Sequence, residues 1–221
     1  LGKTALSSNT TGIKNTVAGY HAGNLVTTGQ QNSFYGHFSG ASTTTGNGNT
    51  AYGNYAYSYA TTGTYNVAIG NYALNGGWTN KLTGNHNIGI GRNSGYNMST
   101  ANNCVFVGAY AGTANTTGSP NTAVGKSALE SNTTGTNNVA VGDNALNANT
   151  TSYSNTAVGS AALQGNTVGF QNIGVGYASL ATNSTGDANT AVGVYALRYA
   201  TTADYNTAVG WSALVSTTNG H

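Results

Sequence analysis

Residues 121–137 read NTAVGKSALESNTTGTN, and the segment that follows directly, 138–154, reads NVAVGDNALNANTTSYS. Both segments begin with Asn and carry Gly at position 5, Ala-Leu at positions 8 and 9, and Asn-Thr-Thr at positions 12 to 14. Self-similarity at a fixed period is typical of solenoids, in which each copy packs only on its neighbours. This short stretch therefore decides how the rest of the chain is interpreted.

The same pattern runs through the whole chain of 221 residues. The position-5 glycine occurs thirteen times, and eleven of the twelve intervals between successive glycines equal one seventeen-residue period. These glycines are Gly2, Gly19, Gly36, Gly53, Gly70, Gly91, Gly108, Gly125, Gly142, Gly159, Gly176, Gly193 and Gly210. The remaining interval, from Gly70 to Gly91, is one period plus a four-residue insertion within residues 75–82. We expect one continuous solenoid segment over residues 1–221, with the first and last copies both cut inside a repeat.

The length and composition of the repeat predict its fold. Seventeen residues are too few for a helical repeat, which needs about 33 to 47 residues. The β-branched residues at positions 2 and 4, the fixed Gly and the Thr-Thr-Gly turn are typical of short strands joined by tight turns. The sequence therefore predicts an all-β parallel β-solenoid, or β-roll, of about thirteen 17-residue coils. Each coil is expected to hold two short strands and to pair with the next coil at about 4.8 Å.

Stacking turns each repeat position into a column of like residues. Asn side chains one coil apart can hydrogen-bond to each other, and Gly permits a backbone turn that a Cβ atom would prevent. The predicted structural ladder of the second half of the chain consists of Asn121, Asn138, Asn155, Asn172, Asn189 and Asn206, with Gly125, Gly142, Gly159, Gly176, Gly193 and Gly210.

Positions 3 and 9 exchange volume between copies. Six of the twelve copies that contain both positions pair Ala with Leu, as in Ala123 and Leu129, whereas three copies pair a larger residue with Gly. These three pairs are Val17 with Gly23, Phe34 with Gly40, and Phe106 with Gly112. Such an exchange indicates that the two positions fill one close-packed space. The sequence leaves open whether that space lies within one chain or between subunits.

The composition excludes several classes of function. Only six residues are Lys or Arg and four are Asp or Glu, which is 5% charged residues where about 25% is usual. A net charge of +2 gives no basis for phosphate neutralisation, so we expect no nucleic-acid partner. No apolar run approaches the length of a membrane span, about 18 residues, so we expect no membrane insertion. The single Cys104 and the scattered histidines predict neither a metal site nor a cofactor.

A resemblance to known families rests on four segments, together with the recurrent NTTG turn. The segments are Asn121–Gly125, Asn155–Gly159, Asn189–Gly193 and Asn206–Gly210. They resemble the head repeats of trimeric autotransporter adhesins, the YadA-like family, and the NTAVG/NTTG arrays of bacterial and phage tail-fibre proteins. The resemblance covers essentially the whole chain, although the typical adhesin head repeat is shorter. It implies a homotrimeric extracellular fibre, on a cell surface or a virion, that presents an adhesive surface to a host glycan or protein.

Two aromatic features are candidates for the adhesive surface. The insertion carries Trp78 and Lys81, and an exposed Trp on a loop can stack on a sugar ring. Position 7 places His21, Phe38, Tyr55 and Tyr72 in four successive coils, and such a platform could hold a ligand or could only stabilise the fibre. The candidate receptor or glycan contacts are therefore Trp78, Lys81, Tyr55 and Tyr72. The structural alternative for Trp78 is a bulge that covers a neighbouring coil.

Two other functions remain as alternatives. Position 16 places Asp187, Asp204 and His221 in consecutive coils, and carboxylates one coil apart could approach the spacing of a retaining glycosidase pair, about 5 Å. A tailspike that acts on a surface polysaccharide would use such a pair. Because the chain offers no other acid pair, we expect no enzyme. The abundance of Thr raises an ice-binding solenoid, but Thr alternates with Val and Ile at position 2, which breaks the required array.

Overall fold

The structure is a computed structural model that describes residues 2–216. These residues form twelve parallel strands and no helix, which confirms the predicted all-β solenoid with one 17-residue repeat per coil. The given sequence starts at position 4 of the first of the thirteen copies, and this copy contributes no strand. By its contacts the chain divides into two compact units, Leu1–Thr117 and Gly118–His221.

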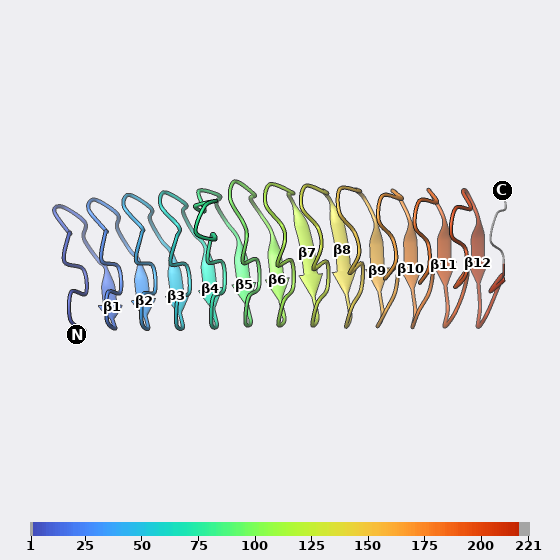
Figure 1. The fold of residues 1–221 in the computed structure, drawn as a ribbon, viewed down its shortest axis with the longest axis horizontal. Helices are drawn as coiled ribbons and strands as arrows, with labels where there is room; N and C mark the ends of the chain where they lie inside the picture. The colour runs from blue at the N-terminus through green and yellow to red at the C-terminus, as the bar shows by residue number, and fades with distance from the viewer. Residues whose placement is uncertain (1, 217–221) are drawn as a thin grey trace. The chain divides into compact units, whose positions relative to one another are not determined.

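The first unit contains six strands that lie side by side in chain order (Figure 1). Its strands are β1 (Thr16–Ala18), β2 (Ser33–Tyr35), β3 (Thr50–Tyr52), β4 (Val67–Ile69), β5 (Ile88–Ile90) and β6 (Val105–Val107). Neighbouring strands pair in parallel with a register of one repeat, so that Thr16 lies opposite Ser33. Between β4 and β5 the register is longer by the insertion, and Val67 lies opposite Ile88.

The second unit has the same architecture without an insertion. Its strands are β7 (Asn121–Val124), β8 (Asn138–Val141), β9 (Thr156–Val158), β10 (Ile173–Val175), β11 (Thr190–Val192) and β12 (Thr207–Val209). They also pair in parallel and in chain order (Figure 1), with Asn121 opposite Asn138 at the first step. In both units the position-3 residue of each strand is buried, while the residues on either side of it are partly or fully exposed.

The expectation of two strands per coil is wrong, because each coil has a single strand. The rest of the coil contains three positions, 7, 9 and 17, at which the backbone is left-handed. In the coil of β9 these residues are Ala161, Leu163 and Gln171, with φ angles of 56°, 50° and 58°. Positive φ angles interrupt an extended strand. This part of the coil is therefore a chain of turns, tied to the next coil by bonds such as Leu163 N–H to Ser179 C=O, at 2.9 Å.

Position 5 requires Gly for two reasons. The φ angle of Gly159 is +133°, and a Cβ atom built on it would lie 2.5 Å from the carbonyl oxygen of Gly176 in the next coil. The same backbone conformation occurs in the other position-5 glycines of the second unit, Gly125, Gly142, Gly176, Gly193 and Gly210. Any other residue within this column would force the coils apart.

The position-1 asparagines form a hydrogen-bonded ladder in the interior. The Oδ1 atom of Asn155 accepts the backbone N–H of Asn172 at 2.9 Å, and its Nδ2 donates to the carbonyl of Gly169, on the far side of its own coil, at 2.9 Å. Equivalent bonds, one to the next coil and one across the coil, are made by Asn121, Asn138, Asn172 and Asn189. Asn206, at the end of this series, donates its backbone N–H to Asn189. The ladder therefore links coils in sequence and also braces each coil internally.

A second Asn ladder, at position 12, was not anticipated from the sequence. In the second unit the Nδ2 atom of Asn149 donates to Asn132 Oδ1 at 2.8 Å, that of Asn166 to Asn149 at 3.2 Å, and that of Asn183 to Asn166 at 2.7 Å. All four side chains are buried. In the middle of the first unit the same position holds Val26, Thr43, Ala60 and Met98. The interior column at position 12 is thus mostly polar in the second unit, whereas it mixes polar and apolar residues in the first.

The space shared by positions 3 and 9 lies inside the chain. A Cβ atom built on Gly40 would lie 2.5 Å from the ring of Phe34, and one on Gly112 would lie 2.7 Å from the ring of Phe106. Both rings are fully buried. The exchange of volume seen in the sequence is therefore a packing rule of the interior of a single solenoid.

Candidate binding site

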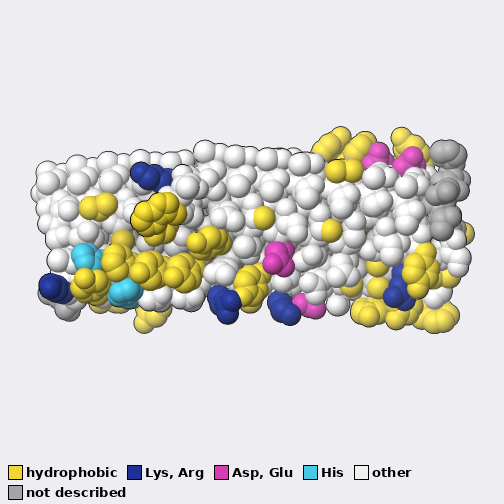
Figure 2. Space-filling view, in the orientation of Figure 1, with side chains coloured by type: hydrophobic (Ala, Val, Ile, Leu, Met, Phe, Trp, Pro, Cys, Tyr) yellow, Lys and Arg dark blue, Asp and Glu magenta, His cyan; other side chains and the backbone are white. Residues whose placement is uncertain are grey.

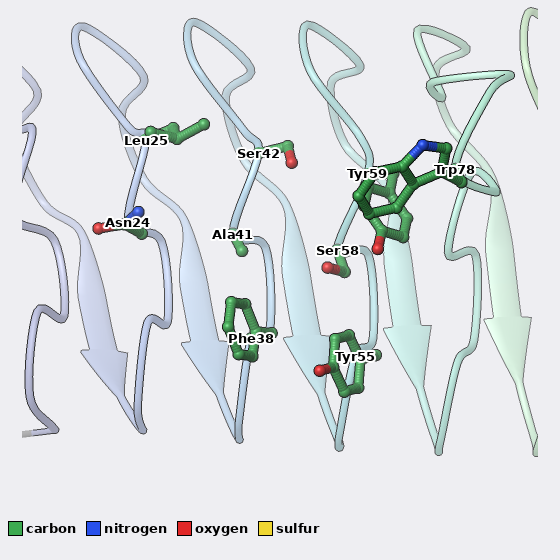
Figure 3. Close-up of a pocket in the computed structure, with 9 residues that line it drawn as sticks. All are labelled: Asn24, Leu25, Phe38, Ala41, Ser42, Tyr55, Ser58, Tyr59 and Trp78. Carbon is green, nitrogen blue, oxygen red and sulfur yellow. The ribbon is translucent and has the colours of Figure 1, made fainter.

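A pocket of about 310 Å³ opens on the first unit (Figure 3). It spans the coils of β1, β2 and β3 and is formed mainly by repeat positions 7, 10 and 11. The insertion adds a residue at one end. The lining residues are Asn24, Leu25, Phe38, Ala41, Ser42, Tyr55, Ser58, Tyr59 and Trp78. Its volume lies at the lower end of the range for small-molecule sites, about 300–1,000 Å³.

One wall of the pocket belongs to the aromatic column at position 7. His21 stacks on Phe38 with ring centroids 4.8 Å apart, and the steps from Phe38 to Tyr55 and from Tyr55 to Tyr72 are both 5.1 Å. The rings are nearly parallel, with interplanar angles of 13°, 4° and 5°. Each of these residues has a positive φ angle, so the column lies on the turns of the coils and not on a strand.

The floor of the pocket is formed by small residues. Ala41 and Ser42 occupy positions 10 and 11 of one coil, and Ser58 occupies position 10 of the next. Ser58 is only 2% exposed. The hydroxyls of Ser42 and Ser58 point toward each other's coils (Figure 3), and neither hydroxyl has a hydrogen-bond partner within residues 2–216. The floor therefore offers hydroxyls that are free to bond to a ligand.

The insertion closes one end of the pocket. Leu74 and Leu82 anchor it in the interior, where both are fully buried, and Gly76 adopts a φ angle of +87° where a Cβ atom would lie 2.8 Å from Leu82 N. Trp78, between these anchors, is 77% exposed. Its ring meets that of Tyr59 edge-on, with centroids 5.4 Å apart. At the other end of the pocket Leu25 is 45% exposed.

The structure separates the predicted contact residues into two groups. Trp78 and Tyr55 line the pocket, whereas Tyr72 only continues the aromatic stack beyond it, and Lys81 is exposed outside the lining. Sequence reasoning missed Ser58 and Tyr59. The signal that could have found Ser58 is the group of small residues Ala41, Ser42 and Ser58 at positions 10 and 11, which leaves a gap beside the aromatic column.

The pocket carries no formal charge. None of its lining residues is Lys, Arg, Asp, Glu or His. Burial, followed by the proximity of Tyr55, Tyr96 and Tyr72, raises the pKa of Tyr59, so its phenol stays protonated and can donate a hydrogen bond near neutral pH. Figure 2 shows hydrophobic and His side chains gathered over the coils of the first unit, with separate Lys and Arg side chains around them. A neutral ligand suits such a site better than an ionic one.

The acidic residues of position 16 take part in the solenoid backbone. Asp187 Oδ1 accepts the backbone N–H of Phe170 at 2.9 Å, and Asp204 Oδ1 accepts that of Asp187 at 2.7 Å. The third member of the column, His221, lies outside the described residues. Both carboxylates are thus engaged by the backbone of the preceding coil.

The two Thr columns differ in their surroundings. At position 13 the hydroxyl of Thr133 donates to the carbonyl of Thr150, and Thr150 to that of Thr167, at 3.1 and 3.2 Å. At position 14 Thr151 is exposed. The first Thr of each turn therefore serves the stack, and the second is the one that can face solvent.

Residues 2–216 provide neither a metal-binding cluster nor a membrane-spanning helix. No group of three or more His, Cys, Asp or Glu side chains in this range could hold a metal ion. No helix in the same range is long and apolar enough to cross a membrane.

Comparison with known proteins gave no match: no protein-family model, no curated protein and no solved structure is significantly similar to this chain.

Proposed function

We propose that the chain is a structural segment of an extracellular fibre, on a cell surface or a virion, in which three copies associate and present a binding surface. The proposal is supported by the resemblance of the repeat to adhesin heads and tail-fibre arrays. The observation that carries it is a column of exposed apolar residues on the outer face of the sheet. This column is formed by position 4 of the strands.

In the second unit the column consists of six valines: Val124, Val141, Val158, Val175, Val192 and Val209. Val124, Val141, Val158 and Val192 are each 36–38% exposed. A contiguous apolar surface on a soluble protein marks an interaction site more often than a free face. The interior face of the same strands holds mainly Ala, as in Ala140 and Ala157, so the strands themselves bury little apolar surface. Association would add to that burial.

The occupant of this column is a further copy of the same chain. Val repeats at the coil spacing of about 4.8 Å, so the column of one copy matches that of another along its length. Homo-oligomers use such repeated, self-matching surfaces. Neither position 2 nor position 4 of β7 to β12 carries a charge, so no like-charge repulsion opposes the contact.

The test is the mass of the assembly in solution, measured by light scattering, together with electron microscopy of the particles. The wild type is expected to be trimeric. Val158→Glu places a charge in the column and is expected to dissociate the trimer while circular dichroism stays unchanged. Thr151→Glu, at an exposed position of the same unit, serves as the matched control and is expected to remain trimeric. A monomeric wild type, or equal masses for both variants, would refute the proposed assembly.

A further inference from the structure

We propose that the pocket of the first unit binds an uncharged oligosaccharide of two or three sugar rings. This inference rests on the proposed function, because it names the ligand that the fibre would bind. Three features of the site carry it: exposed aromatic rings, free hydroxyls in the floor, and the absence of charge. A fourth feature, the length of the pocket, sets the size of the ligand.

The aromatic rings fit the apolar faces of sugars. Trp78 is 77% exposed although it is the largest side chain of the site, and its edge-on contact with Tyr59 leaves the face of the indole open. Phe38 and Tyr55 add two stacked rings along the side. Pyranose rings present C–H groups on one face and hydroxyls at the edge. Rigid aromatic groups can cover such a C–H face with little loss of side-chain entropy.

The floor supplies hydrogen bonds for the sugar hydroxyls. A hydroxyl that faces a pocket and has no protein partner can bond to a ligand without first breaking a bond within the protein. Ser58 is such a group, since it lines the pocket and its side chain has no hydrogen bond among the described residues, and Ser42 lies on the facing coil. A hydroxyl both donates and accepts, as sugar hydroxyls do. The polyproline helix of a peptide offers only backbone acceptors, which makes it a poorer match.

The backbone around the pocket is already paired, so an extended peptide cannot bind there by adding a strand. The N–H groups of Leu25, Ser42 and Tyr59 donate to the carbonyls of Ala41, Ser58 and Asn75 at 3.0, 2.9 and 2.9 Å. Strand addition needs a free sheet edge. The lack of Lys and Arg in the lining likewise gives no counter-charge for a sialylated or sulfated glycan.

The length of the pocket limits the ligand. Leu25 closes the pocket on the coil of β1, and Trp78 closes it beyond the coil of β3 (Figure 3). The distance covers two to three coil spacings of about 4.8 Å each. A sugar ring in a linear oligosaccharide occupies roughly one coil spacing, which gives the stated two or three rings.

The experiment uses an array of immobilised neutral, sialylated and sulfated oligosaccharides, probed with the full chain in its native assembly. The strongest neutral binder is then titrated by calorimetry. Trp78→Ala is expected to weaken binding by about tenfold or more. Trp211→Ala is the matched control, because Trp211 has the same exposure of 77% but lies in the other unit, and it is expected to bind like the wild type.

A filling variant tests the site independently of the Trp. Ser42→Leu places in the floor the residue that Leu25 already has at the same repeat position, one coil earlier, so the fold should accept it. Binding is expected to be lost, while thermal unfolding stays like that of the wild type.

Two results would overturn the inference: no binding to any neutral glycan, or binding to acidic glycans only. Unchanged affinity in both Trp78→Ala and Ser42→Leu would also reject this pocket. Light scattering on the same sample separates the two proposals. A trimer that binds no glycan contradicts only the ligand, whereas a monomer that binds a neutral glycan contradicts only the fibre.

Discussion

Replacing one rung of the Asn ladder should destabilise the first unit strongly. Asn49 is fully buried, its Oδ1 accepts the backbone N–H of Asn66 at 3.0 Å, and its Nδ2 donates to the carbonyl of Gly63 at 2.8 Å. The variant Asn49→Ala would leave both backbone groups unpaired in the interior. Each buried group that loses its partner costs about 1–3 kcal/mol, so the expected loss is about 2–6 kcal/mol.

The loss can be converted into a melting temperature. Unfolding entropy is about 2.1 cal/mol/K per residue, which for the unit Leu1–Thr117 gives ~0.25 kcal/mol/K. The midpoint is therefore expected to fall by roughly 8–24 °C. Thermal unfolding followed by circular dichroism measures it. Hydrogen exchange adds a local readout, because the amide of Asn66 should lose protection.

The matched control is Asn71→Ala in the same unit. Asn71 is exposed at position 6, where its Nδ2 only bonds to Asn54, at 3.2 Å to the side chain, and the change should be close to neutral. Equal midpoints for Asn49→Ala and Asn71→Ala would show that the ladder adds nothing to stability. Such a result would mean that backbone pairing and apolar packing hold the coils without the amides.

Three further changes test other parts of the coil. Gly40→Leu should lower the free energy of unfolding by about 3 kcal/mol through overpacking, and Phe34→Ala by about the same amount through a cavity. The double variant restores the common Ala/Leu pair and should recover stability. A double-mutant cycle of unfolding free energies measures the coupling, and zero coupling would contradict this prediction. Burial raises the pKa of Tyr57 despite the hydrogen bond from Asn66, so the folded state should lose stability above pH ~10, where Tyr57 ionises in the unfolded chain only. Denaturation midpoints measured across this pH range should fall less steeply in Tyr57→Phe than in the wild type. Equal pH dependence in the two proteins would contradict this prediction. Ala161 has a φ angle of 56°, so Ala161→Gly should raise the free energy of unfolding by about 0.5–1 kcal/mol. Ala148→Gly, at a residue whose φ angle is not positive, should lower it by a similar amount. Chemical denaturation gives the sign of each change.

The solenoid was predictable because its signal is repeated thirteen times. The period fixes the register, and the strict Gly at position 5 marks the place where coils approach most closely. The series of turns that completes each coil was not predictable in the same way. Its left-handed positions hold residues such as Leu163 and Tyr55, which avoid positive φ angles in other proteins. The packing of the interior and the bonds between coils override the local preference.

The sequence contains one signal of the left-handed positions, which packing against position 3 also explains. Position 9 holds Gly in four copies, Gly23, Gly40, Gly95 and Gly112, and their φ angles lie between 55° and 59°. The sequence relates three of these glycines to a larger residue at position 3, and the structure shows that contact. The same glycines also relieve the strain that Leu carries in the other copies. Two physical reasons for Gly coincide at one site, and a single sequence reveals only one of them.

The pocket could not be predicted because it belongs to no single repeat. It depends on three coils being stacked, on small residues at position 10 of two of them and at position 11 of one, and on the direction in which the insertion leaves the stack. The sequence showed that Trp78 interrupts the period, but the partner of its ring is Tyr59, which belongs to the preceding coil. Contacts across coils at unequal repeat positions have no periodic signature.

The low charge of the chain now has a more specific explanation. In a stacked column a charge faces its own copy about 4.8 Å away, and the repulsion is tolerated only where a neighbour supplies a compensating dipole. Asp187 and Asp204 satisfy this condition, because each carboxylate accepts a backbone N–H from the preceding coil. Asn47 and Asn85 make the same bond at position 16 of the first unit. Acidic residues therefore occur consecutively at a position where the amide oxygen of Asn already serves as an acceptor.

The two arginines are accommodated differently. The guanidinium of Arg92 lies 4.9 Å from the ring centre of Tyr110, and that of Arg198 lies 4.5 and 5.1 Å from those of Tyr195 and Tyr199. Aromatic faces attract cations without bringing an opposite charge into the stack. These charges are thus balanced by backbone dipoles and aromatic rings. That arrangement leaves the outer valine column and the pocket uncharged, as both proposed contacts require.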